Sequence, residues 1–170
     1  MFTINKLNEV FDGGAIRRYH SIMTNRQQSN AEHQWKVAVF IFAIVDNPSK
    51  ALILRSLIHD CPEILTGDIP SHVKRQNSNL RKEIKLIENH FYEDIECEEL
   101  TEEETRLLKI CDYIEMLSFC LSEKRCGNIM MDEIFANSEF TGLLGSKAIF
   151  NRISYSPRRL SFTDERTKSN

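Results

Sequence analysis

A histidine and an aspartate stand side by side at the end of an apolar run, where their side chains could bind one metal ion. The pair is His59-Asp60, and two further acids, Glu63 and Asp68, follow at four and nine residues from the histidine. Nitrogen and oxygen ligands together suit Mn²⁺, Fe²⁺, Co²⁺, Ni²⁺ or Zn²⁺ better than Ca²⁺. Water bound to such an ion becomes a nucleophile near neutral pH, and the two acids could then transfer protons. The alternative for these acids is a capping or turn role.

Two residues elsewhere in the chain could complete the metal site. His33 shares a helical face with three apolar residues, Val37, Phe40 and Ile44. Asp112 shares a face with Leu108, Met116 and Phe119, and a buried carboxylate there is costly unless a cation or a metal pairs with it. The alternatives stay open: a hydrogen-bonded core histidine for His33, and a salt bridge to Arg17, Arg18 or Arg55 for Asp112. The pattern suggests a metal-dependent hydrolase.

Cations and an aromatic residue on either side of these positions could bind a phosphorylated substrate. Arg17, Arg18, Tyr19 and His20 lie in the polar stretch 15–30, and Lys74 and Arg75 follow Asp68 closely. Arginine binds phosphate through a bidentate fork, and Tyr19 could stack on a base or pack on a sugar. The alternative for the first group is a surface cluster that pairs with the acidic run after residue 93. For Lys74 and Arg75 the alternative is a solvated helix surface.

Helices must position these side chains, because apolar residues recur at helical spacing almost throughout the chain. No alternating pattern is long enough for a sheet, so we expect an all-α bundle. Gly13-Gly14 should end the first helix, and the helix 50–60, apolar on nearly every side, should be the central buried one. Thr101 and Glu104 predict a capping box. The expected helices are residues 3–12, 31–46, 50–60, 79–96, 101–124 and 129–135.

Length and composition limit the alternatives. The 170 residues predict one domain over 1–156, with a polar tail over 157–170. A net charge of −3 argues against nucleic-acid binding, and no apolar run reaches a membrane span of about 20 residues. Five cysteines without a C-x-x-C motif indicate free thiols in a cytoplasmic protein, with Cys61 notable because it adjoins the metal pair. The apolar helix 129–135 is a candidate interface of a homo-oligomer, with an ordinary core role as the alternative.

Several stretches resemble a known family: Ala31-Glu32-His33, the run from Leu57 to Pro70, Val73-Lys74, and Arg18 with an aromatic residue directly after it. Over residues 5–125 the chain resembles the HD-domain metal-dependent phosphohydrolases, and among them the branch that cleaves deoxynucleotides. The resemblance implies an all-helical fold in which His33, His59, Asp60 and Asp112 bind one divalent metal. It further implies that Glu63 and Asp68 are catalytic, that Arg18 holds phosphate, and that Tyr19 shapes the sugar pocket. Bacterial 5′-deoxynucleotidases typically have tryptophan at the position of Tyr19.

Two kinds of enzyme in this branch cut the same bond, between the 5′ oxygen and the α-phosphorus. The 5′-deoxynucleotidases act on deoxynucleoside monophosphates, and compact bacteriophage enzymes release triphosphate from dATP. The five cationic candidates exceed what a monophosphate needs, which favours a dATP or dNTP triphosphohydrolase, with Mg²⁺ accompanying the triphosphate. Such a chain would act in the host cytoplasm if phage-encoded. A nucleotide-binding module without catalysis is a further alternative, although it would need neither Glu63 nor Asp68.

Overall fold

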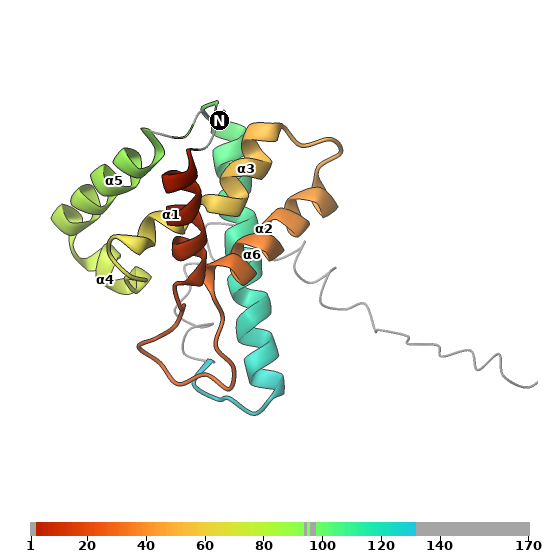
Figure 1. Ribbon diagram of the computed structural model, residues 1–170. Helices are drawn as coiled ribbons and strands as arrows, with labels where there is room; N and C mark the ends of the chain where they lie inside the picture. The colour runs from red at the N-terminus through yellow and green to blue at the C-terminus, as the bar shows by residue number, and fades with distance from the viewer. Residues whose placement is uncertain (1–2, 94, 96–97, 132–170) are drawn as a thin grey trace, which may run out of the picture.

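The computed structural model describes residues 3–93, 95 and 98–131, and this part of the chain is helical, as predicted (Figure 1). Its only β-bridge among these residues is an isolated one between Arg17 and Ser29. A short 3-10 helix, η1, follows α3 directly and carries Glu63. The elements in chain order are α1 (Ile4–Ala15), α2 (Asn30–Ile44), α3 (Lys50–Ile58), η1 (Cys61–Ile64), α4 (Ser71–Gln76), α5 (Ser78–Glu93) and α6 (Glu102–Arg125).

The helices pack around α2, which contacts α1, α3 and α6. In Figure 1, α2 crosses the long helix α6 obliquely, and α4 and α5 form a separate pair on the side of η1. One buried cluster joins three of the helices through Val37 and Ile41 of α2, Leu52 of α3 and Cys111 of α6. The helix predicted as central, α3, buries Leu52 and Ile58, while Leu57 is exposed. The core therefore holds α2, α3 and α6 together, and these are the helices that carry the predicted metal ligands.

Hydroxyl caps fix where the helices begin. Ser29 caps α2, and its Oγ accepts a hydrogen bond from the backbone nitrogen of Glu32 at 3.2 Å. Thr101 and Glu104 form the predicted capping box at the start of α6. Such caps satisfy backbone N–H groups that have no partner within the helix. The cap at Ser29 sets the start of α2 at Asn30, three residues before His33, which places this histidine in the first turn.

The prediction that Gly13-Gly14 ends the first helix is wrong. Helix α1 continues to Ala15, and both glycines are buried within its last turn. A Cβ atom on Gly13 would lie 2.8 Å from the Cα of Cys61, and one on Gly14 would lie 3.2 Å from the Cβ of Ala31. The glycines therefore let α1 approach η1 and α2 closely, which is a packing role and not a helix stop.

Two further differences concern the connections. The sequence did not predict α4, which begins directly after Pro70, and the next helix begins at Ser78 rather than at residue 79. The predicted helix 129–135 is described only as far as Met131, so most of it lies outside the described residues. The end of the predicted domain and the tail 157–170 lie there too. No helix among the described residues is long and apolar enough to span a membrane.

Candidate metal centre

The four predicted metal ligands converge from three helices. His33 lies in the first turn of α2, His59 and Asp60 follow α3, and Asp112 lies in α6. The Nε2 atom of His33 is 3.3 Å from Nε2 of His59 and 3.1 Å from Oδ1 of Asp112. Ligand atoms of His33, His59 and Asp60 all lie within 4.8 Å of one another, a spacing at which they could share one ion. Asp112 lies at the edge of the core, with 39% of its side chain exposed.

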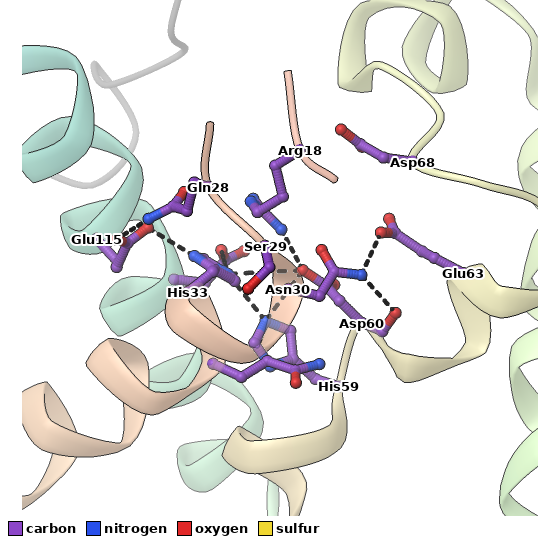
Figure 2. A network of polar contacts seen from close by, with 12 residues as sticks. Arg18, Gln28, Ser29, Asn30, His33, His59, Asp60, Glu63, Asp68 and Glu115 are labelled. Carbon is purple, nitrogen blue, oxygen red and sulfur yellow. Dashed lines mark hydrogen bonds and ion pairs between the residues drawn. The ribbon is translucent and has the colours of Figure 1, made fainter. Parts of the chain in front are cut away.

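Hydrogen bonds fix how the two imidazoles face each other. Nδ1 of His33 lies 2.6 Å from a carboxylate oxygen of Glu115, and Nδ1 of His59 lies 3.0 Å from the carbonyl oxygen of Ser56 (Figure 2). Both partners are acceptors, so each Nδ1 carries a hydrogen, and in the neutral imidazole each Nε2 keeps a lone pair for a metal. Two lone pairs that face each other at 3.3 Å repel unless a cation lies between them. This donor set fits a divalent metal.

The charges around the cluster also favour a cation. Burial and Arg18 lower the pKa of His33, but hydrogen bonds to Asp112 and Glu115 outweigh them and raise it to about 9. Burial raises the pKa of Asp60, yet the charges of His59 and Arg18 hold it far below its ordinary value. The carboxylates are thus ionised and attract positive charge to the point where the imidazole nitrogens meet.

The turn that carries His59 and Asp60 is held from two sides. Tyr92 of α5 donates a hydrogen bond from its hydroxyl to the carbonyl oxygen of His59 at 2.9 Å. Asn30 of α2 is fully buried, and its amide nitrogen lies 3.1 Å from the carbonyl oxygen of Asp60. The backbone of the pair is therefore tied to both α5 and α2, which limits how far the two ligands can move.

Arg18 lies directly against one of the predicted metal ligands. Its guanidinium forms an ion pair with Asp60, and only 14% of the side chain is exposed. The loop 16–29 brings it there, because the backbone nitrogen of Arg18 donates to the carbonyl oxygen of Gln28 at 2.9 Å. The alternative in which Arg18 pairs with the acidic run does not hold.

Tyr19 and Asp68 meet beside this ion pair. The backbone of Tyr19 has a φ of 57°, and its nitrogen donates to a carboxylate oxygen of Asp68 at 3.0 Å. The ring of Tyr19 stacks on Phe119 of α6, with centroids 4.7 Å apart. His20 is more exposed, and its Nδ1 lies 3.9 Å from Asp68. Asp68 therefore makes a contact far along the chain rather than capping its own turn.

Glu63 lies on the other side of Asp60 and has two polar neighbours. The amide nitrogen of Asn30 donates to its carboxylate at 2.8 Å, and Nζ of Lys74 lies 3.7 Å away. Burial, and next the charge of Asp60, raise the pKa of Glu63 to about 8. A carboxyl group with such a pKa can gain or release a proton near neutral pH.

Three of the residues singled out in the sequence are not part of this arrangement. Arg17 is exposed, and its guanidinium contacts Gln27; as the neighbour of Arg18 in an extended segment, it points the other way. Arg75 is exposed on α4. The thiol of Cys61 lies 3.5 Å from the carbonyl oxygen of Val10, and burial raises its pKa to about 11. The side chains of the neighbouring residues Arg17 and Arg18 thus lie on opposite sides of the backbone.

The sequence reasoning missed three buried polar residues of the site: Gln28, Asn30 and Glu115. A signal was present for Glu115, because it is the one charged residue between Tyr113 and Leu121 in the longest apolar part of α6. Gln28 and Asn30 lie in the polar stretch 15–30, where nothing separates them from ordinary loop residues.

Known proteins resemble this chain in sequence and in fold. Residues 14–95 match the family model described as 5′-deoxynucleotidase YfbR-like. The 5′-deoxynucleotidase of Cronobacter sakazakii is 30% identical over 139 residues, covering 66% of this chain and 69% of the relative. The 5′-deoxynucleotidase YfbR of Escherichia coli O127:H6 is 29% identical over 138 residues, with 66% and 69% covered.

Two solved structures share the fold. The HD phosphohydrolase DatZ of cyanophage S-2L, bound to dA and one catalytic Zn²⁺, superposes with a TM-score of 0.62 at 21% identity, covering 90% of this chain and 96% of DatZ. An HD-domain phosphohydrolase from Listeria innocua gives a TM-score of 0.53 at 20% identity, covering 77% and 73%. The family resemblance seen in the sequence is confirmed. The chain belongs to the YfbR-like 5′-deoxynucleotidase family and is a hydrolytic enzyme with the HD phosphohydrolase fold.

Proposed function

We propose that this chain hydrolyses the bond between the 5′ oxygen and the α-phosphorus of deoxynucleotides. One observation carries the proposal: two imidazole nitrogens face each other at 3.3 Å, with Asp60 and Asp112 beside them and Arg18 paired to Asp60. A cation site in contact with a largely buried guanidinium is suited to a phosphate ester. The relatives are named for this activity on deoxynucleotides.

His33, His59, Asp60 and Asp112 would hold one divalent metal, with Zn²⁺, Mn²⁺, Co²⁺, Ni²⁺ or Fe²⁺ all compatible with two nitrogen and two oxygen ligands. When bound, such a metal acidifies water and offsets negative charge on a phosphoryl oxygen. In the alternative of a site without metal, a proton on His33 would lie between the facing nitrogens, and a divalent metal would take the place of that proton.

The remaining residues divide the work of positioning and proton transfer. Arg18 binds phosphoryl oxygens through its planar fork of donors. Glu63 takes a proton from the attacking water, because its raised pKa makes it a stronger base than an ordinary carboxylate. Asp68, in its protonated form, gives its proton to the 5′ oxygen as this oxygen leaves, and is left as a carboxylate. Tyr19, stacked on Phe119 beside Asp68, offers an aromatic wall for the deoxyribose.

The arrangement of cations favours a monophosphate over a triphosphate. Arg18 and Lys74 lie at the site, whereas Arg17 pairs with Gln27 and Arg75 is exposed. The preference for a triphosphohydrolase in the sequence analysis depended on all of these cations binding the substrate. Because Arg17 and Arg75 lie away from the site, that preference has less support. The triphosphohydrolase stays a second candidate, because His20 and Lys74 flank the two acids and could receive further phosphates. A non-catalytic module would not need the pair of acids.

Product analysis tests the proposal and separates its two forms. The purified chain is incubated with Mn²⁺ or Co²⁺ and each dNMP or dNTP, and the nucleoside, orthophosphate and triphosphate are resolved by chromatography. We expect deoxynucleoside and orthophosphate from dNMPs; triphosphate as the product would support the second candidate. No nucleoside from any deoxynucleotide would refute hydrolysis at this bond.

Two neighbouring arginines provide a matched comparison within that assay. Arg18→Ala should lower kcat/KM at least about 100-fold, because it removes the charged fork at the metal cluster. Arg17→Ala removes the same charge one residue away, from a side chain that contacts Gln27, and should leave kcat/KM within about threefold. Equal losses in both variants would contradict the assigned role of Arg18.

A further inference from the structure

Glu115 of α6 is a fully buried carboxylate, which is costly unless each oxygen has a partner. One oxygen, Oε2, lies 2.6 Å from Nδ1 of His33, and the other, Oε1, accepts from the amide nitrogen of Gln28 at 2.7 Å. Nζ of Lys36 lies 3.5 Å from Oε1. The two oxygens thus serve two different parts of the site.

On one side, Glu115 determines how His33 presents its other nitrogen. Because the carboxylate can only accept, Nδ1 of His33 donates, and Nε2 faces His59 and can offer its lone pair to a metal. A carboxylate that holds a ligand histidine in this way fixes both its tautomer and its ring orientation. Without this bond, the imidazole of His33 could turn or carry its hydrogen on Nε2.

On the other side, Glu115 holds the loop that carries Arg18. Gln28 is fully buried, and its amide is fixed by Glu115 while its backbone carbonyl accepts from the nitrogen of Arg18 at 2.9 Å. Two hydrogen bonds in series therefore join α6 to the backbone of Arg18. In Figure 2, dashed lines join Glu115 to both Gln28 and His33, and another joins Arg18 to Asp60 below it.

We propose that Glu115 is a positioning residue that couples the metal ligand His33 to the substrate-binding loop 16–29. Metal binding would hold His33 in one orientation, which keeps Glu115 and Gln28 in place and so orders the backbone of Arg18. The coupling is reciprocal, so loosening the loop at Gln28 weakens the metal site. This inference rests on the proposed function, because it takes His33 to be a metal ligand.

The variant Glu115→Gln tests the proposal because an amide has one acceptor oxygen where the carboxylate has two. Either His33 or Gln28 then faces an amide NH₂ group in place of an acceptor. Glu123→Gln is the matched control. Glu123 is a second buried glutamate of α6, and its carboxylate accepts from the backbone nitrogens of Asn25 and Arg26, three and two residues before Gln28 in the same loop. Its hydrogen-bond partners are Asn25, Arg26 and Asn128, and His33 is not among them.

Metal affinity is measured with Mn²⁺ or Co²⁺ alone, by competition with a chromogenic chelator and without substrate. We expect the Kd to rise about 10–100-fold in Glu115→Gln, the usual effect of removing such a partner, and to stay within about twofold in Glu123→Gln. Hydrogen exchange of the loop peptide 16–29 is the second readout. Added metal should slow this exchange in the wild type and have much less effect in Glu115→Gln.

Each result decides between the possibilities. A metal Kd in Glu115→Gln within about twofold of the wild-type value overturns the inference. It is also overturned if added metal does not slow the hydrogen exchange of peptide 16–29 in the wild type. An equal loss of affinity in Glu123→Gln would assign the effect to general loosening of α6 and also overturn it. If Glu115→Gln does not fold, Glu115→Asp is measured instead, because its shorter side chain keeps the charge but moves it away from His33. A wild-type metal Kd in Glu115→Asp would refute the coupling. A wild-type chain that binds neither ion would overturn the proposed function itself.

Discussion

Replacing Gly13 by alanine should destabilise the protein, although alanine is ordinarily the better helix residue. Gly13 is buried in the last turn of α1 and faces the backbone of η1. An added Cβ would lie 2.8 Å from the Cα and 3.0 Å from the carbonyl carbon of Cys61, and closer still to its carbonyl oxygen. These are backbone atoms, so no side-chain rotation relieves the overlap.

The magnitude follows from two opposing effects. Alanine in place of a helical glycine stabilises by about 0.5–1 kcal/mol. Reaching ordinary van der Waals distance requires α1 and η1 to separate by at least about 0.6 Å, and overpacking of this kind costs about 1–3 kcal/mol. We expect the free energy of unfolding to fall by about 1–2 kcal/mol, and Tm to fall by about 2–8 °C for a chain of this size. Because η1 carries Glu63, turnover should fall as well.

Urea and thermal unfolding, followed by circular dichroism, measure the effect, and Gly14→Ala is the matched control. A Cβ on Gly14 would lie 3.2 Å from the Cβ of Ala31, so the helical gain and the mild strain should leave stability within about 1 kcal/mol of the wild type. If Gly13→Ala proves as stable as Gly14→Ala, the close approach of α1 to η1 is not as described.

Three further substitutions test the site and its supports. Glu63→Gln should keep metal content within about twofold of the wild type, by metal analysis, while kcat falls by about 10²–10⁴, because proton transfer is lost and the ligands remain; unchanged turnover would remove Glu63 from the mechanism. Tyr92→Phe removes the hydroxyl bound to the carbonyl oxygen of His59 and should lower Tm by about 2–4 °C, unless that hydrogen bond contributes nothing. Glu123→Gln should destabilise by about 1–3 kcal/mol at pH 7 by removing charge from a buried loop cap. Burial raises the pKa of Glu123, but hydrogen bonds from Asn25 and Asn128 lower it, and the net pKa is below the ordinary value. The ionised Glu123 therefore stabilises the fold at a pH above the ordinary glutamate pKa, and this stabilisation is lost as the pH falls through the lowered pKa. The difference from the wild type in urea unfolding should therefore shrink below about pH 4, and a difference that is constant with pH would contradict this.

The positions of His33 and Asp112 near the core could be predicted, because these positions depend on helical periodicity. His33 shares its face with Val37, and Asp112 lies in a helix whose neighbouring positions are apolar, so both must lie near the core wherever the helices pack. The family signature around His59 and Asp60 added the expected partners. The all-helical class followed from the same periodicity and is confirmed.

Features that depend on a partner distant in the chain could not be predicted. Gly13-Gly14 reads as a helix stop until Cys61 is seen against it, 48 residues later. The direction of the Arg17 side chain depends on the β-bridge to Ser29, and no local sequence pattern predicts this bridge. Glu115 needed both a buried helix face and a histidine on another helix before its role could be inferred.

One face of α6 carries four side chains that contact the site or its loop, at spacings of three, four and four residues: Asp112, Glu115, Phe119 and Glu123. Loss or gain of a single residue within this stretch would turn everything beyond it by about 100° and shift it by about 1.5 Å along the axis. Phe119 would leave Tyr19, and Glu123 would leave the loop, even if every amino acid type were kept. Natural variation in chain length should therefore be absorbed in the connection after Arg125 or between α5 and α6, and this length of helix should tolerate exchange of residues far better than their insertion or removal.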